Sequence, residues 1–449
     1  MLRSLTLIRA KIAIFAASVL FGGVAWIAAD IVSSMRTVYN APDFQLKSIE
    51  FNDAKFDGEF TLFAETEKPV DLGFVKEGDL FLLSQNGTIV KSSAIGGKQR
   101  RVSEYFTIET ENFLESGGCT AIAFHPDFST KHTRGYGKFF VALTEKKGAG
   151  KTFEQVDGET YQEVIYEFST DDHLAANFKG TRREILRVSN LPDVTGTVIT
   201  DLTFDHKGHL YVGVADSSDT SRSRASDLFS VYGKVLRIDP LIDSKTKAPY
   251  RIPSSNPFFL VKNSLPELWS YGLRNPHTVA YDPFREWVCI SDTGLDMLEE
   301  INVSHFGAEF FGWNLSEGSF YYPPARMNQV GEEIFSPQIE YARSSKIGKN
   351  VGGMIYRGER FPFLDGKAVF ADDSGQILVA EVTPSQSTTR LSVLKPFGNM
   401  KGAVKSLKTG PEGEIFVFCE DGKVFELDKS RALLQHVHFH RALFASVSW

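Results

Sequence analysis

A short pattern of apolar and polar positions recurs six times along this chain. Each copy has an apolar pair, a turn of about four residues rich in Gly, Asp or Pro, and then a strongly apolar run. The clearest copy is residues 202–213, which read LTFDHKGHLYVG. Short apolar runs separated by turn residues predict β-hairpins. The six copies begin at Leu72, Ile122, Leu202, Val279, Gly353 and Leu407.

The spacing of the copies, about 50 to 80 residues, leaves room for a four-stranded sheet in each repeat. Four-stranded sheets repeated around an axis form a β-propeller, which leaves few sheet edges exposed. After residue 36, no helical period extends beyond a turn or two. The pattern therefore predicts an all-β fold of six units, and the spacing is also compatible with an array of β-sandwiches.

Composition agrees with an all-β fold. Of the 449 residues, 37 are Gly and 37 are Phe, as expected for many tight turns between aromatic strands. The net charge of −7 argues against nucleic acid as a partner, because phosphate binding depends on clustered Lys and Arg. The three cysteines, Cys119, Cys289 and Cys419, show no CxxC pattern, and we expect them to be small buried hydrophobic residues.

The N-terminal segment differs from the rest of the chain. Residues 12–32 are an almost unbroken apolar run preceded by Arg3, Arg9 and Lys11, and about 20 such residues span a bilayer. The flanking positive charges predict a cytoplasmic N-terminus, with the rest of the chain in the periplasm or outside the cell. A cleavable signal peptide is the alternative, although its apolar core is usually about 7–15 residues long.

The predicted organisation is thus a membrane anchor (1–36), a polar linker (37–59), the repeats (60–429) and a C-terminal tail (430–449). The tail contains alternating histidines, which on one strand face would form a Zn or Cu site. The alternative is a solvated or membrane-proximal tail without a metal. These histidines are His436, His438 and His440.

Several longer stretches carry a family resemblance. They are residues 117–128 (GGCTAIAFHPDF), 233–239 (GKVLRID), 268–296 (with the GLRNP turn) and 353–367. Through them the chain resembles the glucose/sorbosone dehydrogenase family over about residues 60–427. The resemblance implies a six-bladed β-propeller that oxidises aldoses or sorbosone with pyrroloquinoline quinone (PQQ) and Ca²⁺.

Most residues of these motifs are expected to support turns. Asn275 and Asp127 are of the type that satisfies backbone groups in turns. We expect Arg274 to pair with an acid of a neighbouring blade. His125, inside a His-Pro-Asp turn, is interpreted as a turn residue and not as a catalyst.

The catalytic base that the resemblance implies is not matched. Quinone-using members carry a histidine just before the strand that corresponds to residues 202–204, where it removes a proton from the sugar hydroxyl. Thr197 stands at this position, and no histidine occurs between His173 and His206. Asp201 is the candidate proton acceptor that remains nearby.

The cofactor-binding positions that the resemblance implies also differ. The loop after that strand carries an Arg-Asn pair on the quinone in the family, and Asp219 and Thr220 stand there in this chain. An acid would repel a tricarboxylated quinone. Nearby cofactor candidates are Asp216, Arg222 and Arg224.

Four further positions concern the cofactor and the metal. Asp372 and Asp373 stand where the resemblance implies arginines near the last cofactor-binding strand. For calcium, the resemblance implies ligands at Asp239 and Asp292, whose carboxylates are suitable oxygen donors. The alternative is that these two acids cap exposed turns.

Two functions remain open. The first is a membrane-anchored, exported sugar dehydrogenase-like oxidoreductase with a rebuilt site. The second is a non-catalytic propeller that binds a carbohydrate, a lipid-linked glycan or a protein partner. An exposed aromatic patch would favour the second, and the candidates for it are Phe320, Tyr321 and Tyr322.

Overall fold

The computed structural model describes residues 60–95, 99–109, 117–148, 153, 159, 161–190, 197–216, 224–242, 248–295, 298–321, 333–343, 347–382, 389–390, 395–399 and 403–427. They belong to one compact unit, residues 54–449. The expected anchor, linker and tail, with His436, His438 and His440, lie outside the described residues. Within these ranges, no helix is long and apolar enough to cross a membrane.

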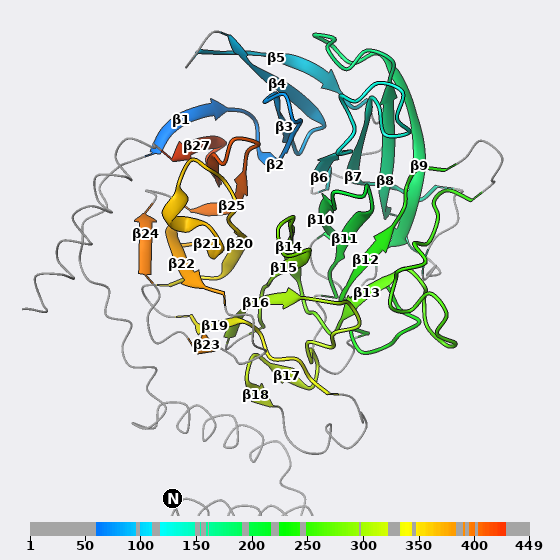
Figure 1. Ribbon diagram of the computed structural model, residues 1–449, viewed down its shortest axis with the longest axis vertical. Helices are drawn as coiled ribbons and strands as arrows, with labels where there is room; N and C mark the ends of the chain where they lie inside the picture. Colours follow the sequence, from blue (N-terminus) through cyan, green and yellow to red (C-terminus); the bar gives the residue numbers. More distant parts are fainter. Residues whose placement is uncertain are drawn as a thin grey trace, which may run out of the picture. The chain divides into compact units, whose positions relative to one another are not determined.

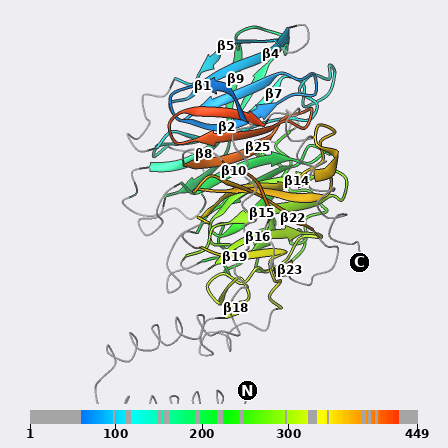
Figure 2. The same cartoon turned by 90° about the vertical axis from the view of Figure 1, so that its left-hand side faces the viewer.

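Six sheets form a ring around a central axis, which Figures 1 and 2 show face-on and edge-on. The all-β six-bladed propeller is therefore confirmed.

From the axis outwards, blade 1 consists of β2 (Pro69–Phe74), β3 (Leu80–Ser84), β4 (Thr88–Ile95) and β5 (Gln99–Thr107). Blade 2 consists of β6 (Cys119–Phe124), β7 (Lys138–Lys146), β8 (Tyr161–Thr170) and β9 (Gly180–Ser189). Blade 3 consists of β10 (Ile199–Phe204), β11 (Leu210–Val214), β12 (Lys234–Ile238) and β13 (Leu268–Tyr271).

The second half of the ring repeats this order with additions. Blade 4 has five strands, β14 (Pro276–Asp282), β15 (Trp287–Asp292), β16 (Leu298–Ser304), β19 (Ile339–Ala342) and β23 (Thr389–Arg390). A small hairpin follows β16, made of β17 (Ser316–Glu317) and β18 (Phe320–Tyr321). Blade 5 has β20 (Asn350–Ile355), the short helix η4 (Pro362–Leu364), β21 (Lys367–Asp372), β22 (Gln376–Glu381) and β24 (Lys395–Asn399).

Blade 6 closes the ring with strands from both ends of the propeller. It contains β25 (Val404–Thr409), β26 (Ile415–Cys419), β27 (Lys423–Leu427) and, as its outermost strand, β1 (Phe60–Glu65). β1 pairs antiparallel with β27, so that Phe60 lies opposite Leu427. Pairing the first strand with the last blade leaves no gap in the ring, which protects its sheet edges.

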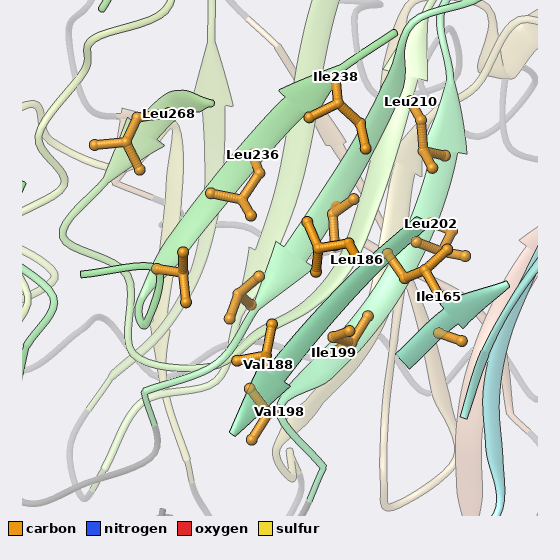
Figure 3. Close-up of a cluster of buried hydrophobic side chains, with 14 of the residues drawn as sticks. Ile165, Leu186, Val188, Val198, Ile199, Leu202, Leu210, Leu236, Ile238 and Leu268 are labelled. Carbon is orange, nitrogen blue, oxygen red and sulfur yellow. The ribbon is translucent and has the colours of Figure 1, made fainter. Parts of the chain in front are cut away.

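Apolar side chains fill the space between neighbouring blades. Figure 3 shows one such cluster, in which Leu186 and Val188 of blade 2 pack against Val198, Leu202 and other residues of blade 3. Side chains that alternate across the pleat give each sheet two apolar faces, as a propeller requires. The three cysteines are free and buried, which confirms their expected place in the core.

A β-bulge recurs in the innermost strand of every blade. The pairing register of β2, β6, β10, β14, β20 and β25 with the next strand shifts by one residue near the strand's start. A bulge inserts one extra residue and re-aims its side chain. The extra residues are Val70, Thr120, Thr200, His277, Val351 and Lys405.

The residue after the bulge joins neighbouring blades. Asp71 Oδ2 accepts the backbone N–H of Ile122 in blade 2 at 2.7 Å. Asp201 Oδ2 accepts the N–H of Val279 in blade 4 at 2.9 Å, and Thr278 Oγ1 accepts the N–H of Gly353 at 3.1 Å. Since all these acceptors are buried, the bonds pair backbone N–H groups of the innermost strands with an acceptor in the neighbouring blade.

Candidate ligand site at the mouth of the central channel

The bulges surround a pocket at one end of the central channel. Its volume is about 510 Å³, and all six bulged residues are among those that line it. Small-molecule sites usually have volumes of roughly 300–1,000 Å³. Because every blade contributes a side chain from the same position of its inner strand, the propeller's repeat itself builds the pocket.

An ion triad lies in this pocket. Lys408 Nζ contacts Asp201 Oδ1 at 2.8 Å and Asp71 Oδ1 at 3.0 Å. These residues come from blades 6, 3 and 1, so the lysine reaches across the channel. Both carboxylates are buried, and each also accepts two backbone N–H groups.

Burial and charge act in opposite directions on the triad. Burial raises the pKa of Asp71 to about 6, although Lys408 lowers it. Burial also disfavours the ammonium form of Lys408, but the two carboxylates outweigh this effect and raise the pKa of the lysine. The lysine is therefore a positive charge already shared between two acids, and it is no nucleophile at neutral pH.

Other polar groups line the same pocket. His277 Nε2 lies 3.1 Å from the carbonyl oxygen of Lys405, and burial lowers the pKa of this histidine. Asp373 accepts the N–H of Lys349 at 2.8 Å, and Glu420 is exposed. Thr197 is also a lining residue and is exposed. The pocket thus offers hydroxyl, carboxylate, imidazole and ammonium groups.

The structure brings some of the predicted site residues together. Thr197, Asp201 and Asp373 all line the pocket, as expected for positions that correspond to the base and the cofactor-binding strand. Asp201 is not a free base, since Lys408 and two backbone N–H groups occupy its carboxylate. Asp372 is buried beside the pocket in a turn, where it accepts the N–H groups of Gly348 and Gln376.

The remaining cofactor candidates lie elsewhere or outside the described residues. Asp216 Oδ2 accepts the N–H groups of Arg224 and Ala225 at 2.8 and 3.1 Å, so it supports a loop. The Arg224 guanidinium lies over the ring of Tyr232 at 5.8 Å. Asp219, Thr220 and Arg222 lie outside the described residues.

The two candidate metal ligands are not brought together. Asp292 ends β15 at the pocket end of blade 4 and accepts the N–H groups of Arg274 and Asn275 at 2.9 and 2.6 Å. Asp239 follows β12 at the opposite end of blade 3, where it pairs with Arg251. Among the described residues, no three His, Cys, Asp or Glu side chains are grouped to hold a metal ion.

Two motif residues, His125 and Arg274, can be compared with their predicted roles. His125 Nδ1 accepts the N–H of Asp127 at 3.0 Å, which confirms that His125 is a turn residue, and burial lowers its pKa to about 4. Arg274 differs from the prediction, because its guanidinium donates to the carbonyl groups of Thr293 and Gly294 and lies over Trp313. The backbone N–H of Arg274, and not its side chain, donates to the carboxylate of Asp292.

The aromatic candidates form only a small exposed area. Phe320 is half-buried and Tyr321 is 44% exposed, both in the β17–β18 hairpin. Tyr322 lies outside the described residues. This hairpin does not contribute to the channel-mouth pocket.

The sequence interpretation missed Asp71, Lys408 and His277, although the repeats carried a signal. Asp71-Leu72 and Asp201-Leu202 begin two copies in the same way. In the other inner strands, the position equivalent to Lys408 holds smaller or uncharged residues: Gly73, Ala123, Thr203, Ala280 and Met354. A lysine at a position that faces a narrow channel predicts acid partners across it.

Comparison with known proteins places the chain in a family. The model of the "Glucose / Sorbosone dehydrogenase" family matches residues 66–426, and the chain belongs to this family. It is 25% identical to aldose sugar dehydrogenase YliI of Escherichia coli (strain K12) over 268 residues, which cover 59% of this chain and 67% of YliI.

Other relatives bear different names. HIPL2 protein of Arabidopsis thaliana is 26% identical over 345 residues (66% of this chain, 48% of HIPL2). Human Hedgehog-interacting protein is 26% identical over 378 residues (80% of this chain, 47% of that protein). The chain therefore spans about half the length of these two relatives.

Solved structures show the same fold. The apo form of soluble aldose sugar dehydrogenase from Escherichia coli superposes with a TM-score of 0.60 at 21% identity, covering 82% of this chain and 98% of that one. The PQQ-bound aldose sugar dehydrogenase from Streptomyces coelicolor superposes with a TM-score of 0.57 at 18% identity, covering 83% and 98%. At these identities, the likeness concerns the fold.

Proposed function

We propose that this protein binds a sugar in the channel-mouth pocket and does not bind PQQ there in the manner of its quinone-using relatives. One observation carries the proposal: the pocket has the position and size of a ligand site, but its charged groups are arranged for a different ligand. The proposal retains a sugar as the ligand, as the family name implies, but without PQQ as the cofactor in this pocket.

The residues present do not fit PQQ. The described residues that line the pocket include the carboxylates of Asp71, Asp201, Asp373 and Glu420, but no arginine. A tricarboxylated quinone would face these acids, and like charges at short distance repel strongly where water is partly excluded. Lys408, a half-buried cation, is already bound by two of the acids. Thr197 cannot act as a base in place of an imidazole.

The same lining suits the hydroxyl groups of a sugar. Thr200 Oγ1 donates to the carbonyl of Pro276 and Thr120 Oγ1 to that of Ala142, so the lone pairs of both hydroxyl oxygens are oriented as acceptors. Carboxylate oxygens accept two or more hydrogen bonds each. Gln85 and Asn275 add amide groups to the lining. A ligand with many hydroxyl donors matches such a surface.

A second candidate is oxidation of a sugar at a rebuilt site. Asp71 is the pocket carboxyl whose pKa, about 6, suits proton transfer near neutral pH, but Lys408 and two backbone N–H groups occupy it as they occupy Asp201. When bound, PQQ would accept the hydride in this reaction, and Ca²⁺ would polarise it. Because the lining does not fit PQQ, we derive no catalytic steps from this candidate.

The location of the protein is part of the proposal. The apolar run at residues 12–32 is long enough to span a bilayer, and the positive charges before it support a propeller in the periplasm or outside the cell. In this arrangement the anchor (1–36) and linker (37–59) hold the propeller at a membrane, where free sugars or glycans are accessible to it.

The test is a calorimetric titration of the full-length protein with a panel of aldoses. Thr197→Trp places a large side chain on an exposed lining position and should abolish sugar binding. Thr181→Trp, an equally exposed position on the outer strand β9, is the matched control and should bind like the parent protein. Absence of binding by the parent protein, or equal binding by both variants, would contradict a sugar site in this pocket.

A further inference from the structure

The charged groups of the pocket are unequal in number. Four carboxylates line it, those of Asp71, Asp201, Asp373 and Glu420, against the two ammonium groups of Lys405 and Lys408. The formal charge of these six groups is therefore −2. His277 adds no positive charge at neutral pH, because burial lowers its pKa. A concave surface with one sign of excess charge concentrates its field inside the cavity.

The lysines do not cancel this field for a ligand. Lys408 is held between Asp71 and Asp201, so these three groups together keep one negative charge. Lys405 is exposed, and its side chain can move into solvent. A negatively charged ligand would have to displace Lys408 from both acids, whereas a positively charged ligand would not.

Two further carboxylates are accessible from the pocket. Asp373 is half-buried and accepts one backbone N–H, that of Lys349, so part of its carboxylate remains available. Glu420 is exposed on the turn after β26. The two residues come from blades 5 and 6, which are neighbours in the ring. A ligand ammonium group in the pocket meets acids from two blades.

We propose that the ligand of this pocket is an amino sugar, in which the hydroxyl groups bind the polar lining and the free ammonium group pairs with Asp373 and Glu420. This inference rests on the proposed function and specifies its substrate class. It follows from the charge of the lining, since a neutral aldose can donate hydrogen bonds to the acids but carries no positive charge to pair with their excess negative charge. The acetylated form of the same sugar lacks the charge and should bind weakly.

A calorimetric titration of the full-length protein with four related sugars tests the proposal. At about pH 7 the amino group of a free amino sugar, like an α-amino group, is largely protonated. We expect glucosamine to bind at least about tenfold more tightly than glucose and N-acetylglucosamine, and glucuronate to bind most weakly. Raising the salt concentration should weaken the binding of glucosamine and leave that of glucose nearly unchanged.

Variants locate the charge effect. Asp373→Asn together with Glu420→Gln should reduce the affinity for glucosamine to that for glucose. Asp421→Asn removes one negative charge from the residue next to Glu420, outside the pocket lining, and should change neither affinity. Equal binding of glucose and glucosamine would overturn the amino-sugar inference and leave the sugar site intact. Absence of binding of all four sugars would overturn both.

Discussion

Lys408 Nζ lies 2.8 Å from Asp201 Oδ1, although 207 positions separate the two residues in the sequence. The pair joins blade 6 to blade 3 across the channel, and Asp71 extends it to blade 1. Each carboxylate also accepts backbone N–H groups of its own and of the next blade. The triad therefore belongs both to the pocket lining and to the contacts that hold the ring together.

Removal of the lysine should destabilise the propeller. Lys408→Ala leaves two buried carboxylates facing each other without a counter-charge, and breaking a buried pair in this way costs about 3–5 kcal/mol. The measurement is the free energy of unfolding from denaturant titration. Lys405→Ala, an exposed lysine on the same strand, is the control and should change it by less than about 0.5 kcal/mol. Equal effects of the two variants would show that the triad is not structural.

The triad should make stability depend on pH between about 4 and 6. The folded-state pKa of Asp71 is raised from 3.8 to about 6, so the folded protein binds this proton more tightly than the unfolded chain. Its contribution is fully present below pH 3.8 and is lost as the pH rises through 6. The loss amounts to about 3 kcal/mol, from the difference between the two pKa values.

Asp71→Asn tests this contribution, because the amide does not titrate. The free energy of unfolding is measured from pH 4 to 7 for both proteins. Relative to Asp71→Asn, the parent protein should become less stable as the pH rises over this interval. Ser406→Ala changes a pocket residue without a titratable group, so its profile should run parallel to that of the parent. If the pH profiles of Asp71→Asn and the parent protein run parallel, Asp71 is not the source of the pH dependence.

The hydrogen bonds between neighbouring blades should contribute separately. Thr278→Val keeps the shape of the side chain but removes the acceptor for the N–H of Gly353, which is buried. An unsatisfied buried donor costs about 1–3 kcal/mol. The control is Thr107→Val, which removes a surface hydroxyl that donates to the exposed Glu104. The free energy of unfolding, measured by denaturant titration, should hardly change in this variant. A loss of stability in this control as large as in Thr278→Val would refute the role of the blade contact.

Much of the fold could be predicted from the sequence, because each blade repeats a local signal. In the copy at residues 202–213, the segment that begins at Leu202 lies in β10 and the apolar run 210–214 forms β11. The inner strands begin about three residues earlier than the apolar pairs, since the bulge and the following polar residue precede them. β1 was not predicted as part of a blade, because its pairing with β27 depends on ring closure and not on local pattern.

The candidate site could be predicted only in part. Comparison with the family pattern identified Thr197, Asp201 and Asp373, and these residues do line the pocket. The occupation of Asp201 by Lys408 could not be inferred from local sequence, since it depends on which side chains meet across the channel. Likewise, Asp239 and Asp292 are similar in sequence context, but strand direction places them at opposite ends of their blades.

The most direct test of the central claim is a titration of the full-length protein with PQQ in the presence of Ca²⁺. Quinone absorbance reports binding, and dye-linked oxidation of a panel of aldoses reports turnover. We expect no binding at tens of micromolar PQQ and no oxidation, because four carboxylates line the pocket and Lys408 is already paired. Stoichiometric PQQ binding with turnover would contradict this account and would show that the pocket is a rebuilt dehydrogenase site.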